Sequence, residues 1–167
     1  DTDVRRIAVI IELNSDKELN GLEIVRSIYT GKTKDFITAV DEKSVIIVRE
    51  VKENENYDEL TKSCKGLLDM LHSEGLTRCR IALGTIIHEI KDVSRSYKEA
   101  KMALDVGKIF YNERPIVAYS NLGIGRLIYQ LPVPLCKMFI KEIFDGKSPD
   151  DLDEETLTTI NKFFENS

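Results

Sequence analysis

The order in which strand-like and helix-like segments alternate is the feature of this sequence that most restricts its fold. Short apolar or β-branched runs predict strands, whereas apolar residues that recur every three or four positions predict helices. The expected strands are residues 5–13, 35–40, 44–51, 80–83 and 116–119, and the expected helices begin at Leu22, Asp58 and Ser94. The first six elements follow the order βαββαβ. This order predicts an α/β (α+β) fold with a ferredoxin-like, antiparallel sheet and two helices on one of its faces.

The strands and the first two helices have distinct local signals. Residues 5–13 are apolar on both faces, which predicts a central strand, and the turn at 41–43 predicts a hairpin. The first helix is expected to stop at Gly31 and the second at Gly75. An apolar stripe marks the buried face of the second helix: Leu60, Cys64, Leu67, Leu68 and Leu71.

The helix that begins near Ser94 is also well marked. Ser94 or Ser96 is expected to cap its start, because Ser96 and Glu99 have the spacing of a capping box. Gly84, before the helix, predicts a strand end or close helix packing, and Gly107 is expected to end the helix in a left-handed conformation. The expected buried face is formed by Val93, Tyr97, Ala100, Ala103 and Leu104.

One run in this helix resembles a known family. Residues 96–104 read Ser-Tyr-Lys-Glu-Ala-Lys-Met-Ala-Leu, which is similar to the last third of GGDEF-type domains, the diguanylate cyclase fold. The run resembles still more closely the degenerate GGDEF-like middle domain of bacterial transcription regulators of the sugar-diacid and purine-catabolism type. The resemblance implies a sheet of the GGDEF/nucleotide-cyclase type with an extra helix and strand, followed by C-terminal helices.

The C-terminal part of the sequence extends the resemblance. Residues 119–123, Tyr-Ser-Asn-Leu-Gly, are similar to the run that closes the GGDEF-like part of these regulators, although Asn121 replaces their usual aspartate. After residues 126–130 the chain is expected to break at Pro132 and Pro134, and a helix is expected at 135–144, followed by a linker at 146–149. A last helix, capped by Asp153, carries a segment similar to the one that opens the regulators' helix-turn-helix domain. We therefore expect domains at 1–120 and 121–167, with DNA bound only through a further domain outside this chain.

An active cyclase of this fold needs metal-binding carboxylates and glycines beside the nucleotide. The resemblance places the candidate carboxylates at Glu12, near the end of the first strand, and at Asp41 and Glu42 in the hairpin. Both signature glycines are missing, because the hairpin reads Val40-Asp41-Glu42-Lys43-Ser44. A β-branched side chain therefore stands where the backbone would approach a nucleotide. We assign no catalytic, cofactor-binding or metal-binding residue.

Other chemistries find little support. His72 and His88 do not have metal-ligand spacing, and the sequence contains no phosphate-binding loop of the P-loop type. Gly123-Ile124-Gly125 lacks the third glycine and the βαβ setting of a dinucleotide site. The basic residues Arg78, Arg80, Lys91, Arg95 and Lys98 are dispersed among acids, which predicts a solvated surface.

Charge and cysteine usage restrict the function further. The net charge of −5 argues against binding of nucleic acid by electrostatics alone. The three widely spaced cysteines predict reduced thiols in a cytoplasmic protein. No apolar run has the length needed to span a membrane.

Three functions follow as hypotheses. The first is a non-enzymatic domain that transmits a signal and supports homodimerisation in a cytoplasmic bacterial transcription regulator. The ferredoxin-like sheet leaves one face for the C-terminal helices or a second copy to cover. The alternative is a sensor that holds a small molecule or nucleotide at the degenerate site, and the third is an active diguanylate cyclase.

Overall fold

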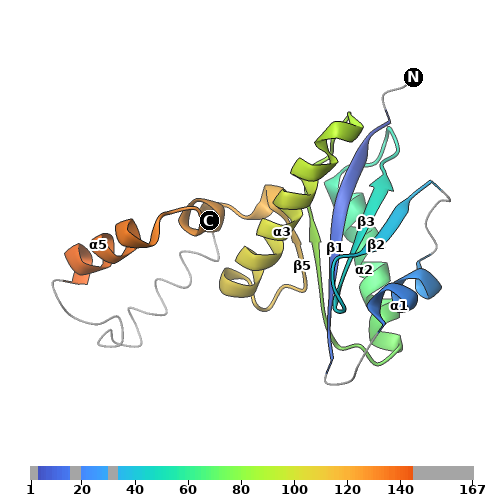
Figure 1. Cartoon of the computed structure of the whole chain (residues 1–167), viewed down its shortest axis with the longest axis horizontal. Coiled ribbons are helices and arrows are strands. Elements are labelled where there is room, and N and C mark those ends of the chain that lie inside the picture. The colour runs from blue at the N-terminus through green and yellow to red at the C-terminus, as the bar shows by residue number, and fades with distance from the viewer. Residues whose placement is uncertain (1–3, 16–19, 30–33, 145–167) are drawn as a thin grey trace. The chain divides into compact units, whose positions relative to one another are not determined.

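A five-stranded sheet forms the centre of the fold, with strand order β2-β3-β1-β4-β5 (Figure 1). The computed structural model describes residues 4–15, 20–29 and 34–144. The strands are β1 (Arg6–Asn14), β2 (Phe36–Ala39), β3 (Ser44–Glu50), β4 (Arg78–Leu83) and β5 (Ile116–Ala118). The helices packed on this sheet are α1 (Gly21–Ile28), α2 (Tyr57–Ser73) and α3 (Val93–Phe110). The predicted ferredoxin-like order is confirmed.

Strand β1 is central, as predicted from its apolar character. It pairs antiparallel with β3 on one side and with β4 on the other, so that Ile10 lies opposite both Ile46 and Ala82. Strand β5 extends the sheet parallel to β4. The fifth strand therefore makes the sheet mixed rather than purely antiparallel.

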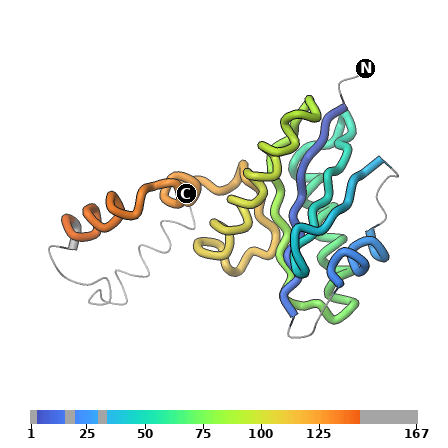
Figure 2. The backbone as a smooth tube through the Cα atoms, viewed as in Figure 1, coloured from blue at the N-terminus to red at the C-terminus, as the bar shows by residue number. Residues whose placement is uncertain are grey.

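The two faces of the sheet are covered by different helices, which lie on opposite sides of the strands in Figure 2. Alternate residues of β1 point to opposite faces. Ile7, Val9 and Ile11 join the core that contains α1 and α2, whereas Ile10 joins the core beneath α3. Helix α3 packs on β1, β4 and β5. The predicted ferredoxin-like unit has no helix on this second face of the sheet. In the structure, α3 covers this face in part.

Helix α2 has a strong signal at each end. Asn56 accepts a hydrogen bond from the Glu59 N–H (3.1 Å), and the Glu59 carboxylate accepts from the Asn56 N–H (3.2 Å), which completes a capping box. At the other end Gly75 has φ 82°, and the Leu76 N–H donates to the Leu71 carbonyl (3.0 Å). This is a Schellman motif, and it confirms Gly75 as the stop signal.

The predicted start of α3 near Ser94 is confirmed to within one residue, but the predicted cap at its start and the predicted stop at Gly107 are both wrong. The helix begins at Val93, after a short 3₁₀ turn at Ile90–Asp92, and has no side-chain cap. It continues past Gly107 to Phe110. Gly107 serves close packing instead, because a Cβ atom there would lie 2.9 Å from Val117 Cγ2.

Ser96 has a different role from the predicted cap. Its side chain is fully buried, its Oγ accepts from the Ala8 N–H (3.0 Å) and donates to the Thr85 carbonyl (2.7 Å). The Ser96 hydroxyl thereby accepts the hydrogen bond of a β1 backbone N–H that lies just beyond the last residue pair of β1 and β4. Gly84 permits this contact, since a Cβ atom there would lie 2.0 Å from the Ser96 carbonyl oxygen. The expectation that Gly84 marks close helix packing is confirmed.

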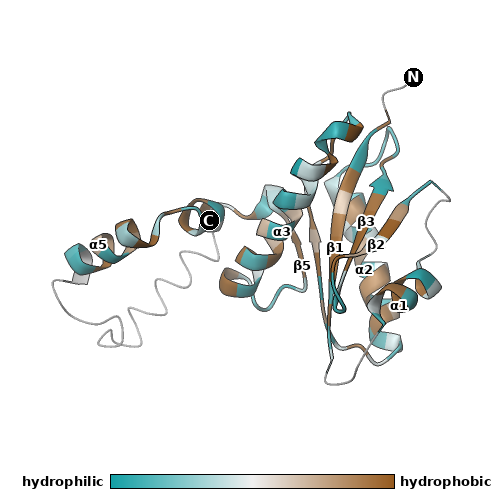
Figure 3. Cartoon of the chain, in the orientation of Figure 1, coloured by the Kyte–Doolittle hydropathy of each residue, from teal (hydrophilic) through white to brown (hydrophobic). Residues whose placement is uncertain are grey.

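The chain divides into two compact units, residues 1–122 and 123–167. In the second unit the helices are α4 (Ile124–Tyr129), which was not predicted from the sequence, and α5 (Val133–Phe144), which begins two residues earlier than predicted. Figure 3 shows hydrophobic and hydrophilic stretches alternating along α5. The predicted stop at Gly31, the linker at 146–149 and the last helix lie outside the described residues. None of the helices in the described ranges has the length and apolar character needed to cross a membrane.

Candidate functional site

The β2–β3 hairpin is an ordinary polar turn closed by its own side chain. The Val40 N–H donates to the Ser44 carbonyl (2.8 Å), and the Asp41 carboxylate accepts from the Lys43 N–H (2.8 Å). An aspartate that bonds the backbone two residues onward is a common turn residue. Asp41 therefore has a structural role in this turn, and the exposed Val40 side chain stands before it.

Helix α1 packs directly against the hairpin. Gly21 opens this helix, and an ideal Cβ atom at Gly21 would lie 3.2 Å from the Glu42 carbonyl oxygen and 3.0 Å from Leu13 Cδ1. The Lys43 carbonyl also accepts from the Leu13 N–H (2.7 Å). On the side where α1 packs, the protein's own backbone thus occupies the space beside the hairpin.

Glu12 does not join the hairpin acids. It belongs to the residues of β1 that face α3, where its carboxylate forms an ion pair with Lys108 and accepts from Asn14 Nδ2 (3.0 Å). The Glu12 carboxylate is therefore already engaged by two partners within the protein. Across the part of the chain that the structure describes, no three His, Cys, Asp or Glu side chains gather as they would around a metal ion, and this includes His72 and His88.

A cationic cleft opens at the same end of the sheet, with a volume of about 610 Å³. Its basic residues come from three segments: Lys43 from the hairpin, His72 from α2, and Arg78 and Arg80 from β4. Arg80 is held by the side chain and carbonyl of Asn112. The lining also contains one acid, Glu113, and the polar residues Asn14, Ser15, Thr77 and Asn112.

The cationic cleft corrects the expectation of dispersed basic residues. Arg78 and Arg80 stand two positions apart on β4, which places them on the same face of the strand. That spacing was visible in the sequence, but their approach to Lys43 depends on the pairing of β1 with both β3 and β4. Lys91 and Arg95, by contrast, form ion pairs near the start of α3, with Glu89 and Glu99 among their partners.

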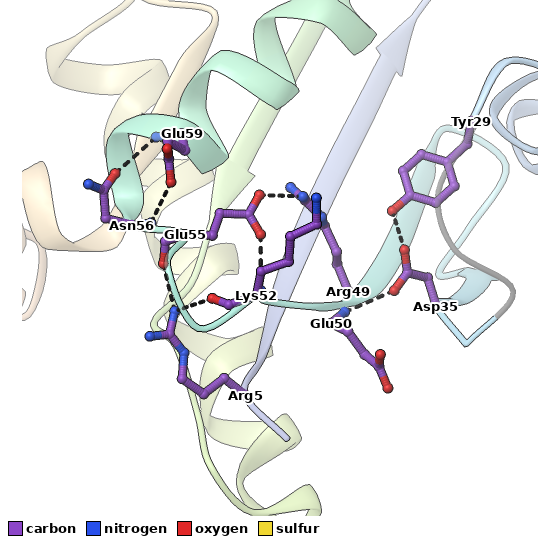
Figure 4. Close-up of polar contacts among 9 residues, drawn as sticks. All are labelled: Arg5, Tyr29, Asp35, Arg49, Glu50, Lys52, Glu55, Asn56 and Glu59. Atoms are coloured by element: carbon purple, nitrogen blue, oxygen red, sulfur yellow. Dashed lines mark hydrogen bonds and ion pairs between the residues drawn. The ribbon is translucent and has the colours of Figure 1, made fainter. Parts of the chain in front are cut away.

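A polar network lies at the opposite end of β3 (Figure 4). Arg49 forms an ion pair with Glu55, which is only 9% exposed, and the second Glu55 oxygen accepts from the Lys52 N–H (3.2 Å). Arg5 donates to the carbonyls of Lys52 (3.0 Å) and Glu55 (2.6 Å). These bonds fix the loop between β3 and α2 to Arg5, the residue directly before the central strand β1.

Two further residues of Figure 4, Tyr29 and Asp35, join α1 to the start of β2. The Tyr29 hydroxyl donates to the Asp35 carboxylate (2.7 Å), which also accepts from the Glu50 N–H (2.9 Å). Burial and the bond to Asp35 raise the pKa of Tyr29, so its hydroxyl stays protonated at neutral pH.

A cavity of about 260 Å³ lies beside this network, lined by residues of α2, β1 and β3 and by Tyr29 directly after α1; we call it the α1–α2 cavity. Cys64 is in its wall, and burial raises the pKa of this thiol to about 12. A thiol with this pKa is protonated at neutral pH and is a poor nucleophile. The cavity is therefore suited to binding rather than to covalent chemistry.

The sequence did not single out the residues of this network. Arg49 and Glu55 sit in a charged stretch that resembles any exposed loop, and their burial follows from the position of α2 over β3. The capping signal at Asn56 and Glu59 was the one available hint that the chain turns sharply there.

Comparison with known proteins gives one family. A family model described as a GGDEF-like domain matches residues 1–106, which includes the hairpin, the polar network and most of α3. No curated protein and no solved structure matches the chain.

Proposed function

The chain belongs to the family of GGDEF-like domains, and on this premise we propose that it is a non-catalytic domain that transmits a signal and supports self-association in a cytoplasmic bacterial transcription regulator. The hairpin is the observation that carries the proposal. Its glycines are replaced, Asp41 closes the turn, and α1 packs on its backbone. The third candidate acid, Glu12, is neutralised by Lys108 on the other face of the sheet.

The regulator context is supported by the C-terminal half of the sequence. The runs at 96–104, 119–123 and 156–166 are each similar to the corresponding run in regulators of the sugar-diacid and purine-catabolism type. In such a protein, DNA binding would be carried by a helix-turn-helix domain outside this chain. The free thiols of Cys64, Cys79 and Cys136 support a reducing, cytoplasmic setting.

Self-association is supported by the part of the sheet that α3 leaves uncovered. β2 is an edge strand, and Phe36 on it is 65% exposed. Its cross-strand partner Val48 and the neighbouring Ile46 are only partly buried. An apolar edge of this kind is a common place for a second copy to pair.

Product analysis tests the catalytic half of the proposal. The protein is incubated with GTP and Mg²⁺, and the mixture is examined by liquid chromatography with mass spectrometry. We expect no cyclic dinucleotide and no pyrophosphate above a protein-free control. Formation of cyclic diguanylate that depends on Asp41 would refute the non-catalytic role.

Sedimentation equilibrium tests self-association. We expect a monomer–dimer equilibrium whose dissociation constant rises by about tenfold or more in Phe36→Lys. The reason is that the substitution replaces an aromatic side chain that the dimer would bury with a charged one. Ile90→Lys is the matched control, since Ile90 is 68% exposed in the short turn before α3. A wild-type protein that stays monomeric at high concentration would contradict self-association.

The second candidate function is a sensor for a small anion, and the cationic cleft is the observation that favours it. In a chain of net charge −5, four basic residues and one acid surround this hollow. Calorimetric titration with pyrophosphate, without Mg²⁺, tests this reading. Binding that weakens about tenfold in Lys43→Gln but not in Lys98→Gln would support the sensor, and an absence of heat would remove it.

A further inference from the structure

The α1–α2 cavity combines an apolar floor with a charged rim. Val9, Ile47, Leu60 and Leu67 form the floor, and each is almost fully buried. Arg49, Lys52, Tyr29 and Asp35 stand among the polar lining residues. Ligand sites in proteins usually have this composition, with apolar walls and a few polar groups that fix orientation.

The acids near the cavity are already engaged by protein partners. Both Asp35 oxygens accept hydrogen bonds, from the Tyr29 hydroxyl and the Glu50 N–H. Glu50 forms an ion pair with Arg6 (3.8 Å). The acids at the rim are therefore not poised to receive a cation.

The cations have donor capacity left. Within residues 4–15, 20–29 and 34–144, the Lys52 ammonium has no acidic partner. Arg49 contacts Glu55 through its Nη2 atom alone. A guanidinium carries five N–H donors and an ammonium three. The charge available to a ligand at this rim is positive.

The Lys52 backbone is fixed before any ligand arrives. Its N–H donates to the Glu55 carboxylate, and its carbonyl accepts from both Arg5 Nη2 (3.0 Å) and the Glu55 N–H (3.0 Å). A cation on a fixed backbone loses less conformational entropy when it binds a ligand. The loop therefore presents Lys52 as part of a built site.

We propose that the α1–α2 cavity binds a small carboxylate with an apolar body, such as one ring or a short branched chain. The apolar body would rest on the floor, and the carboxylate would meet Lys52 and Arg49 at the rim. The size agrees, because an apolar cavity of about 150 Å³ can hold benzene, and this cavity of about 260 Å³ has room for a ring and a carboxylate. This site goes beyond the signalling role proposed above and does not depend on it.

The proposed site is distinct from the cationic cleft. Lys43 precedes β3 and Lys52 follows it, and β3 spans seven residues. At about 3.3 Å per residue this separates the two ends by roughly 23 Å. One small ligand cannot contact both lysines.

Benzoate is the test probe, with benzamide as its neutral counterpart of the same shape. Binding to the whole chain is measured by ligand-observed NMR and calorimetry. We expect benzoate to bind and benzamide to bind about tenfold more weakly, as the loss of one charge-assisted contact requires. Lys52→Met should weaken benzoate by about the same factor and leave benzamide unchanged. Lys62→Met is the control, because Lys62 is an exposed lysine of α2 outside the cavity lining.

A second pair of variants tests whether the probes bind inside the cavity. Gly66 lies in the cavity wall, and a Cβ atom there would meet nothing within 4 Å. Gly66→Leu should fill the cavity and abolish binding of both probes, whereas Gly66→Ala should retain benzoate binding. The proposal is overturned if benzoate does not bind at millimolar concentration, if Lys52→Met and Lys62→Met behave alike, or if Gly66→Leu binds benzoate as the wild type does.

Discussion

The two faces of the sheet are packed in opposite ways. On one face α2 contributes large side chains, with Leu60, Leu67 and Leu71 buried against β1 and β4. On the other face α3 contributes mostly small ones, Ser96, Ala100, Ala103 and Gly107, beside the larger Leu104 and Val106. The first face is stabilised by the burial of large apolar side chains, and the second by the close approach of the α3 backbone to the strands.

The glycines make this difference concrete. Beneath α3, a methyl group at Gly84 or Gly107 would lie less than 3 Å from other atoms, whereas at Gly66 of α2 it would meet nothing. Interiors are close-packed, so an added methyl is tolerated only where space exists. The comparison therefore predicts opposite responses to the same Gly→Ala change on the two faces of the sheet.

Gly84→Ala should have the largest effect. The new methyl group would overlap the Ser96 carbonyl oxygen at 2.0 Å, and because this oxygen belongs to the helix backbone, α3 would have to move. We expect a loss of about 3 kcal/mol or more in the free energy of unfolding. Urea denaturation followed by circular dichroism measures it. A loss below about 1 kcal/mol would show that α3 can shift freely and would break the comparison.

Ser96→Ala should come next. The change leaves the buried Ala8 N–H and Thr85 carbonyl without their side-chain partner. An unsatisfied buried polar group costs about 1–3 kcal/mol, so we expect a loss of about 2 kcal/mol in the same denaturation experiment. Ser94→Ala, at an exposed position of α3, is the control and should change stability by less than about 0.5 kcal/mol. Equal effects of the two substitutions would contradict the role given to Ser96.

The α2 face can be tested through pH, because it buries Cys64. Burial raises the pKa of this thiol from 9.0 to about 12. Above pH 9 the unfolded thiol ionises while the folded one stays neutral, so stability is present below pH 9 and is lost as pH rises towards 12. The contribution of Cys64 should fall by about 1 kcal/mol between pH 9 and 10.

Cys64→Ala isolates this contribution. Cavity formation lowers its stability at every pH, but its stability should fall less steeply than that of the wild type above pH 9. Denaturation curves at pH 8, 9 and 10 provide the comparison. Parallel pH profiles would mean that Cys64 is not buried as described.

Gly66→Ala should have the smallest effect and the opposite sign. The position is exposed and helical, and the added methyl meets no neighbour. Alanine favours the helix over glycine by up to about 1 kcal/mol, so the free energy of unfolding should rise by about 0.5–1 kcal/mol. A loss of stability here would remove the contrast between α2 and α3.

The same contrast explains which features the sequence could predict. Helix α2 follows its local signals, from the leucine stripe to the left-handed Gly75. A helix that packs through large apolar side chains shows a periodic apolar pattern in its sequence. The cap residues predicted for α3 were wrong at both ends, although the predicted start near Ser94 was correct to within one residue. Ser96 and Gly107 have the residue types of helix caps, but tertiary contacts with Ala8 and Val117 determine their roles.

The candidate sites depend even more on tertiary structure. The loss of the hairpin glycines was visible in the sequence, and so was the turn role of Asp41. The salt bridge between Glu12 and Lys108, which are 96 positions apart, was not. The cationic cleft and the α1–α2 cavity were also missed, since each needs the strand order before its residues become neighbours.

Calorimetric titration with GTP, with and without Mg²⁺, tests the central claim most directly: the acids of the hairpin do not hold a metal–nucleotide complex. The account predicts no Mg²⁺-dependent heat beyond dilution for the wild type, and none for Asp41→Asn. A saturable, Mg²⁺-dependent binding heat in the wild type that Asp41→Asn abolishes would contradict it, because Asp41 would then hold a metal ion rather than only closing a turn.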